Sequence, residues 1–354
     1  MERQSLSIAR EKLTHDENHP QLQTPYEFLA DFVDRAKTAQ NRIVQQTMYF
    51  GGGTNLSKEF QQVLAGAVAR GVPVTWGVDN FMNDFPDAQV GLLPKTLRRL
   101  TQKFRTKKDQ NDSTLEALRM DGVDVRRTNM APLRSKLIPV AGRIHSKIAV
   151  IDDTAWLLEP NLGEEYNFSH ANNVVRFTDP AVADVFVDYA QKVHNNEKFN
   201  DYSVPINDTC TFYADAGTPG RSVIRDTAIS MVRSAEHDIK FASQFPPSGK
   251  MRKELIKKAN EGKVITFYTS KEFENSLLMK KFLENPNIQV VFNDGIVHSK
   301  ALLIDADKDD NTGKVLFGTN NIHPLGIWGG TGEIAIKSAD QSFVKQVNEF
   351  FVNI

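Results

Sequence analysis

The chain has 354 residues, which is long for one compact core and sufficient for two lobes. Hydrophobic residues make up 40% and charged residues 25%, which is ordinary for a globular protein. The net charge of −1 excludes a molecule built overall as a polyanion binder, so any attraction to phosphate groups must come from a local patch.

The first half of the chain alternates between helix and strand patterns. Apolar residues recur at helical spacing from Leu29 to Ala36, and the alternating stretch from Ile43 to Phe50 predicts a strand. A second helix is expected from about Ser57 to a stop at Gly71, and a strand should follow through Val72 to Trp76.

The second half repeats this order. The stretch from Ser222 to Phe245 predicts a helix and a strand, and a further helix should end at Gly262, before a strand through Val264 to Phe267. Such alternation predicts an α/β fold of two similar lobes, each a mixed, parallel-rich sheet flanked by helices.

The two copies differ in length. Between the helix stop and the next shared motif the first copy is longer, which predicts an insertion at about residues 80–117. Turn-forming residues from Asp201 to Gly220 mark the joint between lobes. The predicted division is an N-terminal tail over 1–23, a first lobe over 24–205 and a second lobe over 206–354.

One polar triplet occurs twice, in "RIHSKIAVIDD" and "IVHSKALLIDAD": His, one residue, Lys, four mostly apolar residues, then Asp. Residues two apart in a strand share a face, so His145 lies beside Lys147 and His298 beside Lys300. A lysine offers charge-assisted hydrogen bonds to phosphate oxygens and disfavours protonation of its neighbouring imidazole.

Two such pairs, related by pseudo-twofold packing of the lobes, would place two imidazoles on opposite sides of one phosphorus. One histidine can attack and hold a phosphohistidine, while the other protonates the leaving alkoxide and then deprotonates the incoming hydroxyl. Two lysines and nearby amides can neutralise the phosphate oxygens, so we expect no metal and no other cofactor. One copy alone would carry little weight, because a buried strand edged by polar residues also explains it.

These motifs resemble those of the phospholipase D superfamily, whose hallmark is His-x-Lys-x4-Asp followed by Gly-Ser/Thr-x-Asn. Among its branches the chain is most similar to cardiolipin synthases and related phosphatidyltransferases, in stretches such as "LAGAVARGVPV", "DAGTPGRSVI" and "SQFPPSGKM". The resemblance spans about Pro25 to Ile354. It implies a phosphodiesterase or phosphatidyltransferase that acts on phospholipids through a phosphohistidine.

The resemblance also implies roles for individual residues. His145 would be the nucleophile and His298 the general acid, with Glu333 as the carboxylate that orients a catalytic histidine. The structural motif residues Asp152 and Asp305 would brace the lobes. The phosphate-binding residues would be Lys147, Lys300, Asn161, Thr319 and Asn321.

The first motif departs from the family pattern. "LEPN", from Leu158 to Asn161, stands where the family has a glycine-rich turn. Glu159 would repel a bound phosphate unless it points away or pairs with a base. By counting from Leu158, Asn173 stands where a carboxylate is expected, so a catalytically weak first half is one interpretation.

The insertion carries a basic, amphipathic stretch, Leu93–Lys108. Four apolar residues fall three or four apart and seven basic residues surround them, with no acid before Asp109. Such a helix can lie in an anionic membrane interface. The alternative is a helix that packs on its own lobe with a solvated basic face. The same charges would attract a nucleic-acid backbone, although near-neutral net charge disfavours that partner.

Three functions remain open at this point. The first is phosphatidyl transfer or its sibling, phospholipase D hydrolysis; the second is nucleic-acid phosphodiester cleavage; the third is lipid binding by a relative with a weakened first motif. The single Cys210 fits a reducing compartment. The N-terminal stretch lacks an apolar segment, and no apolar run approaches the length of a membrane span. We therefore expect a cytoplasmic protein without a signal peptide. Peripheral attachment to the inner face of the membrane is compatible with that location.

Overall fold

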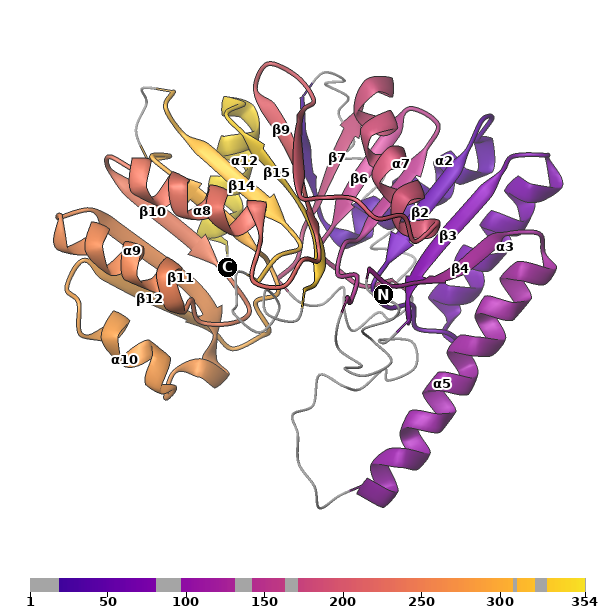
Figure 1. Cartoon of the computed structure of the whole chain (residues 1–354), viewed down its shortest axis with the longest axis horizontal. Coiled ribbons are helices and arrows are strands. Elements are labelled where there is room, and N and C mark those ends of the chain that lie inside the picture. Colours follow the sequence, from indigo (N-terminus) through magenta and orange to yellow (C-terminus); the bar gives the residue numbers. More distant parts are fainter. Residues whose placement is uncertain are drawn as a thin grey trace.

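The computed structural model describes residues 19–80, 97–130, 142–162, 171–307, 311–321 and 330–353. Within them the strands form two mixed sheets, one of seven strands and one of eight. Figure 1 shows the two sheets side by side, with the first half of the chain (indigo to magenta) on one side and the second half (orange to yellow) on the other.

The first sheet has the strand order β1-β7-β6-β5-β2-β3-β4. Strands β2, β3 and β4 are parallel to one another, and the other neighbours pair antiparallel. The strands are β1 (Gln21–Gln23), β2 (Ile43–Thr47), β3 (Val74–Asp79), β4 (Asp124–Thr128), β5 (Ile148–Ile151), β6 (Thr154–Leu158) and β7 (Val174–Thr178).

The second sheet has the order β12-β11-β10-β13-β14-β15-β9-β8. Its parallel part is β10, β11 and β12, and the other neighbours are antiparallel. The strands are β8 (Tyr202–Pro205), β9 (Cys210–Ala216), β10 (Asp238–Ala242), β11 (Val264–Ser270), β12 (Ile288–Asn293), β13 (Ala301–Ile304), β14 (Lys314–Gly318) and β15 (Gly332–Ser338).

The two sheets repeat one topology, since β4-β3-β2-β5-β6-β7-β1 corresponds strand for strand to β12-β11-β10-β13-β14-β15-β9. The predicted two-lobed α/β fold is thereby confirmed. Parallel pairing is confined to three strands in each sheet. The connection between β5 and β6 consists of two residues, Asp152 and Asp153, and strands joined by so short a loop run antiparallel.

Helices cover both outer faces and fill the space between the sheets. Residues of α2, α3 and α5 form a core with the outer face of the first sheet, and residues of α8, α9 and α10 do so with the second. The helices are α2 (Pro25–Thr38), α3 (Asn55–Ala69), α5 (Leu97–Met120), α7 (Pro180–His194), α8 (Val223–Ser234), α9 (Gly249–Asn260), α10 (Leu277–Leu283), α12 (Gln341–Val352) and the 3-10 helix η2 (Lys271–Phe273).

The central core is common to both lobes. Apolar residues of α7 and α12 pack in one cluster with residues of both sheets. The ring of Phe186 in α7 lies 5.2 Å from that of Phe212 in β9, and the ring of Phe351 in α12 lies 5.0 Å from that of Tyr268 in β11. From the first sheet, the amide of Leu22 donates to the side chain of Gln346 in α12 at 2.8 Å. The lobes are therefore joined by a continuous hydrophobic core.

Strand pairing departs from the predicted boundaries at two places. Strand β1 lies within the segment predicted as a tail, and its residues pair with β7 of the first sheet. Strand β8 lies at the end of the predicted first lobe but pairs with β9 of the second sheet. In both cases a strand of three or four residues extends the edge of a sheet. A segment this short is not recognisable from a sequence pattern.

Helix α5 occupies the region of the predicted insertion. It stands between β3 and β4 as α10 stands between β11 and β12, but it has 24 residues against 7. In Figure 1 its C-terminal part lies beside α3 and β4, while its start extends away from both sheets. Residues 81–96 and the side chains of 97–107, which include most of the predicted amphipathic stretch, lie outside the described part. Among the described residues, no helix combines the length and apolar character needed to cross a bilayer.

Candidate active site

The repeated motifs lie at the seam between the two sheets. The sequence predicted that the His-x-Lys segments lie in strands. In the structure they immediately precede strands β5 and β13. Their amides pair across the seam instead of within a sheet. The amides of His145 and the next residue donate to Gly332 O at 2.8 and 3.2 Å, and those of His298 and the next residue donate to Ala171 O at 3.2 and 2.9 Å. Each motif is thus fixed by the opposite half of the chain.

Both motif lysines are buried at this seam. Lys147 is fully buried and Lys300 is 5% exposed. The Lys147 ammonium donates to the carbonyl of His145 at 3.2 Å, and Lys300 makes the same contact with His298. Burial, together with the neighbouring charge of Lys300, lowers the pKa of Lys147 to about 7. The two ammonium groups therefore act on one another, as expected for a shared anion site.

His145 is oriented by a carboxylate from the second half. Its Nδ1 lies 2.9 Å from Glu333 Oε2, which also accepts a hydrogen bond from Thr319 Oγ1 at 2.5 Å. Burial lowers the pKa of His145 well below its usual value, and the charges of Lys147 and Lys300 add to that effect. The imidazole is therefore neutral near pH 7. Nδ1 is the ring nitrogen that contacts the Glu333 carboxyl group, so Nε2 is the nitrogen that this contact leaves for other chemistry.

Glu333 shares this buried environment. Burial raises its pKa to about 8, against the opposing effects of the Thr319 hydroxyl and both lysines. Glu333 is the second residue of β15, directly after the carbonyl of Gly332 that holds the His145 segment. The backbone contact and the side-chain contact therefore come from adjacent residues of one strand.

His298 is oriented differently. Its Nδ1 lies 2.7 Å from the Oδ1 of Asn172, which follows the Ala171 carbonyl as Glu333 follows that of Gly332. The residue opposite Glu333 is therefore Asn172, and the prediction of Asn173 was wrong by one position. The segment between Glu159 and this residue is one shorter than the segment between Thr319 and Glu333, and nothing in the sequence reveals that difference.

Glu159 points into the seam, toward the segment that carries His298 and Lys300. It is fully buried, and its Oε1 accepts from the Ser299 hydroxyl at 3.0 Å and the Lys300 amide at 2.5 Å. Its Oε2 accepts from the Asn173 amide at 2.8 Å. Burial raises the pKa of Glu159, while the Lys300 ammonium opposes that change. The carboxylate therefore lies beside a base, Lys300, which is one of the two arrangements that would limit its repulsion of a phosphate.

The motif asparagines keep hydrogen-bonding capacity. Within the described residues, Asn161 Oδ1 and Asn321 Oδ1 are buried without a hydrogen-bond partner. Asn161 precedes Leu162, whose carbonyl accepts from the amide of Gly51 at 3.0 Å, so the glycine-rich loop after β2 lies against the first motif. No group of three or more His, Cys, Asp or Glu side chains suited to a metal ion occurs in the part of the chain described.

The motif aspartates are engaged by backbone amides. Asp152 accepts from the amides of Gln40, Asn41 and Arg42 at 2.9, 2.8 and 3.0 Å. Asp305 accepts from two successive amides, at 2.9 and 2.8 Å, in the matching loop before β10. Both residues have a positive φ, 53° and 54°. Each aspartate thus ties the end of its motif strand to the loop that enters the sheet.

A third buried carboxylate, which was not predicted, supports the second motif. Asp215 in β9 pairs in register with Glu333 and accepts from Ser222 Oγ at 2.6 Å and Asn320 Nδ2 at 3.1 Å. Burial raises its pKa to about 7. Its only sequence signal is its place in "DAGTPGRSVI". These contacts fix the Gly318–Asn321 turn beside Lys300.

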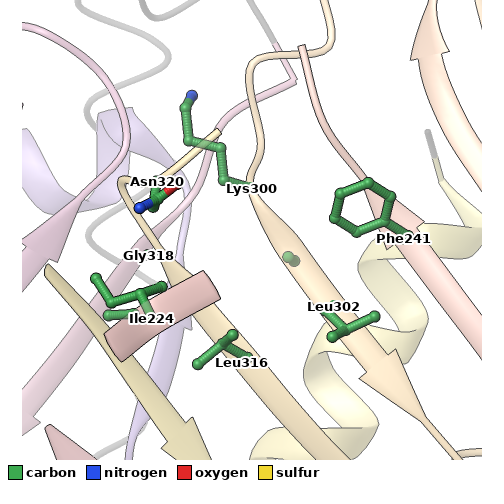
Figure 2. Close-up of a pocket in the computed structure, with 9 residues that line it drawn as sticks. Ile224, Phe241, Lys300, Leu302, Leu316, Gly318 and Asn320 are labelled. Atoms are coloured by element: carbon green, nitrogen blue, oxygen red, sulfur yellow. The ribbon is translucent and has the colours of Figure 1, made fainter. Parts of the chain in front are cut away.

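Below this turn lies a narrow cavity of about 10 Å³, room for one water at most. In Figure 2 the polar ends of Lys300 and Asn320 lie at one end, while Phe241, Leu302 and Leu316 line the other. The cavity is too small for an acyl chain. Any lipid substrate must therefore place its chains outside this part of the second lobe.

Arg143, which directly precedes the first motif, also contributes to the site. Its positive charge favours the neutral form of His145 and the ionised form of Glu333. Its guanidinium contacts the sulfur of Met48 at 3.6 Å. With Lys147 and Lys300 it gives the seam three cations around the first histidine, the electrostatics expected of a site for a phosphate group.

No protein-family model matches the sequence, and no curated protein is similar enough in sequence to be counted as a relative. Among solved structures, a phosphatidylserine synthase from Haemophilus influenzae Rd KW20 matches with a TM-score of 0.68 and 13% identity, covering 98% of this chain and 89% of that chain. A polyphosphate kinase from Porphyromonas gingivalis matches with a TM-score of 0.59 and 13% identity, covering 94% of this chain and 50% of that one. At these identities the likeness is one of fold, and this chain shares the two-lobed arrangement of those structures.

Proposed function

We propose that the protein is a phosphodiester-cleaving transferase that acts on phospholipids through a phosphohistidine, in the manner of a cardiolipin synthase-like phosphatidyltransferase. One observation carries the proposal: the two His-x-Lys motifs meet at one seam, and each histidine is oriented by a residue of the opposite half. A repeated structural motif has no need of that crossed arrangement, whereas an in-line displacement at one phosphorus does.

The first step forms one bond and breaks one. Nε2 of His145 attacks phosphorus, the bond from phosphorus to the leaving-group oxygen breaks, and His298 in its protonated form donates a proton to that oxygen. Lys147 and Lys300, with the amides of Asn161 and Asn321, neutralise the non-bridging oxygens. Glu333 stabilises the positive charge that develops on the His145 ring.

The second step reverses these roles. Neutral His298 removes a proton from the acceptor hydroxyl, whose oxygen attacks phosphorus and displaces His145. An alcohol such as phosphatidylglycerol yields a new phosphodiester, and water yields phosphatidic acid. The fold of the solved phosphatidylserine synthase supports a phosphatidyl group as the transferred unit, although by fold alone.

The membrane surface is the proposed location of the substrate. The sequence of α5 from Arg98 to Lys108 contains six basic residues and no acid, and the start of the helix extends away from both sheets (Figure 1). A cationic helix held away from the body can reach anionic head groups. We propose that this end of α5 contacts the lipid surface.

The decisive experiment traps the covalent intermediate. Wild-type protein would be mixed with bis(p-nitrophenyl) phosphate, quenched without acid, and digested for mass spectrometry. The expected adduct is an acid-labile phosphoryl group on the His145 peptide, absent from His145→Ala. Because p-nitrophenolate leaves without a proton, His298→Ala should still form the adduct in a burst and then turn over at least 100-fold more slowly.

The lipid test separates the alternatives. Incubation with phosphatidylglycerol vesicles should give cardiolipin if the protein is a transferase and phosphatidic acid if it is a hydrolase. Faster cleavage of labelled DNA than of any lipid would favour the nucleic-acid reading. A His298→Ala variant indistinguishable from wild type in every assay would overturn the enzyme proposal and favour lipid binding without turnover.

A further inference from the structure

The glycine-rich loop that follows β2 contacts the first motif. The amide of Gly51 donates to the carbonyl of Leu162 at 3.0 Å, and Phe50 and Leu162 form a parallel bridge. Leu162 directly follows the motif residue Asn161, which is 5% exposed. The position of this asparagine therefore depends on the position of the loop.

Helix α5 holds the other side of the loop. The amide of Gly52 donates to Asn111 Oδ1 at 2.6 Å, and Asn111 is 1% exposed. A Cβ added at Gly52 would lie 2.5 Å from the carbonyl oxygen of Gln110 and 2.8 Å from the Cα of Asn111, so the two backbones are in direct contact. At Gly52, therefore, only glycine avoids a clash with α5.

An ion-pair cluster anchors α5 beside this contact. Asp112, the residue after Asn111, contacts the guanidinium of Arg127 in β4. It also accepts from Lys108 Nζ at 2.7 Å. Further along the helix, Leu118 is fully buried in the core of the first lobe. The turn of α5 that bears Asn111 is thus fixed to the sheet and gives the loop a rigid support.

The second half of the chain cannot form the same bond. Ile43 and Ile239 are equivalent, because each pairs with the residue that precedes a motif aspartate. Eight residues further on, the first half has Gly51 and the second half has Pro247, which lacks an amide hydrogen. The helix that corresponds to α5, α10, has 7 residues instead of 24. The connection from helix to loop to motif therefore belongs to the first half and is not a requirement of the repeated fold.

We propose that α5 is part of the active site, with Asn111 as a positioning residue that sets the place of Asn161 through the glycine-rich loop. This role rests on the proposed function, in which Asn161 binds the non-bridging oxygens of the phosphate group. When Asn111 is truncated, the buried amide of Gly52 loses its acceptor, and the loop must shift to reach another. That shift displaces Leu162 and moves the side-chain amide of Asn161 away from the phosphate group.

A double-mutant cycle tests this coupling, with bis(p-nitrophenyl) phosphate as the substrate. Asn111→Ala and Asn161→Ala should each lower kcat/KM per folded molecule at least about 10-fold, since each removes or displaces a hydrogen bond to a charged group. The double variant should lie within about threefold of Asn161→Ala alone, because both changes remove the same contact. If Asn111 had a merely structural role, the two losses would multiply.

Two further variants secure the cycle. Leu118→Val trims a buried side chain on the same helix and is the matched control. It should lower the melting temperature, keep kcat/KM per folded molecule within about twofold of wild type, and act independently of Asn161→Ala. If Asn111→Ala does not fold, Asn111→Leu carries the same cycle, because leucine fills nearly the same volume and lacks the acceptor.

The outcomes separate the two proposals. A wild-type protein that neither cleaves the diester nor forms a phosphohistidine would overturn the proposed function, and the role of Asn111 would fall with it. A wild-type protein that forms the adduct, together with losses that multiply in the double variant, would overturn the role of Asn111 alone. Normal kcat/KM in either Asn111→Ala or Asn161→Ala would do the same.

Discussion

Replacement of Asp152 tests whether the motif aspartates brace the lobes or take part in chemistry. Asp152→Ala removes an acceptor from three amides, those of Gln40, Asn41 and Arg42. The loop is partly solvated, so each lost bond costs about 0.5–1 kcal/mol. The positive φ of 53° at Asp152 adds about 1 kcal/mol for alanine. The expected loss in free energy of unfolding is therefore about 2.5–4 kcal/mol.

Asp152→Asn refines the test. Asparagine tolerates the left-handed conformation, and its Oδ1 can still accept from Asn41 and Arg42, so the loss should be about 1 kcal/mol. The neighbouring Asp153→Asn, whose side chain is 53% exposed, is the control and should stay within about 0.5 kcal/mol of wild type.

The assay pairs stability with turnover. Urea unfolding followed by the fluorescence of the buried Trp76 and Trp156 gives the free energy, and cleavage of bis(p-nitrophenyl) phosphate gives kcat per folded molecule. We expect turnover per folded molecule within threefold of wild type for both Asp152 variants. An Asp152→Asn protein of normal stability with turnover reduced 100-fold would refute the bracing role.

Further predictions concern packing, pH and the membrane. Gly318→Ala puts a Cβ 2.5 Å from a neighbouring backbone carbonyl and should lower the free energy of unfolding by about 1–3 kcal/mol in the same urea assay. Gly66→Ala on α3 adds a Cβ that meets little, so it should raise the free energy of unfolding by about 0.5–1 kcal/mol. With a pKa of about 7, Lys147 is charged below that pH and neutral above it, so kcat/KM should fall as the pH rises past 7 to 8. Lys147→Arg should flatten this basic limb, because arginine stays charged. A wild-type profile that stays level to pH 10 would contradict this prediction. The double variant Arg98→Glu/Arg99→Glu should bind phosphatidylglycerol vesicles at least about 30-fold more weakly in a sedimentation assay, at about 1 kcal/mol per basic group removed. Binding equal to that of the wild type would contradict the lipid contact.

The doubled architecture was predictable because it depends on residue patterns that are local in the sequence. Helical spacing before Ile43 and before Ile239, each followed by an alternating strand, located the same order of elements in both halves. The His145 and His298 motifs then identified the polar seam. These features depend on near neighbours in the chain, for which residue type and spacing are informative.

The partners of the histidines were not equally predictable. Glu333 was identified by its distance along the chain from Gly318, but the same count gave Asn173 in place of Asn172. The direction of Glu159 depends on Lys300, which is remote in sequence and adjacent only after the lobes meet. Contacts across the seam are set by the packing of two sheets, and no local pattern encodes a shift of one residue there.

The common core formed by α7 and α12 has a consequence for how the protein works and how it unfolds. The two lobes cannot separate by a hinge motion, because that would expose the apolar surface that both sheets bury against those helices. A chain cut in the joint near Asp208 should remain an associated, active complex, and thermal melting should occur in one cooperative transition for both lobes.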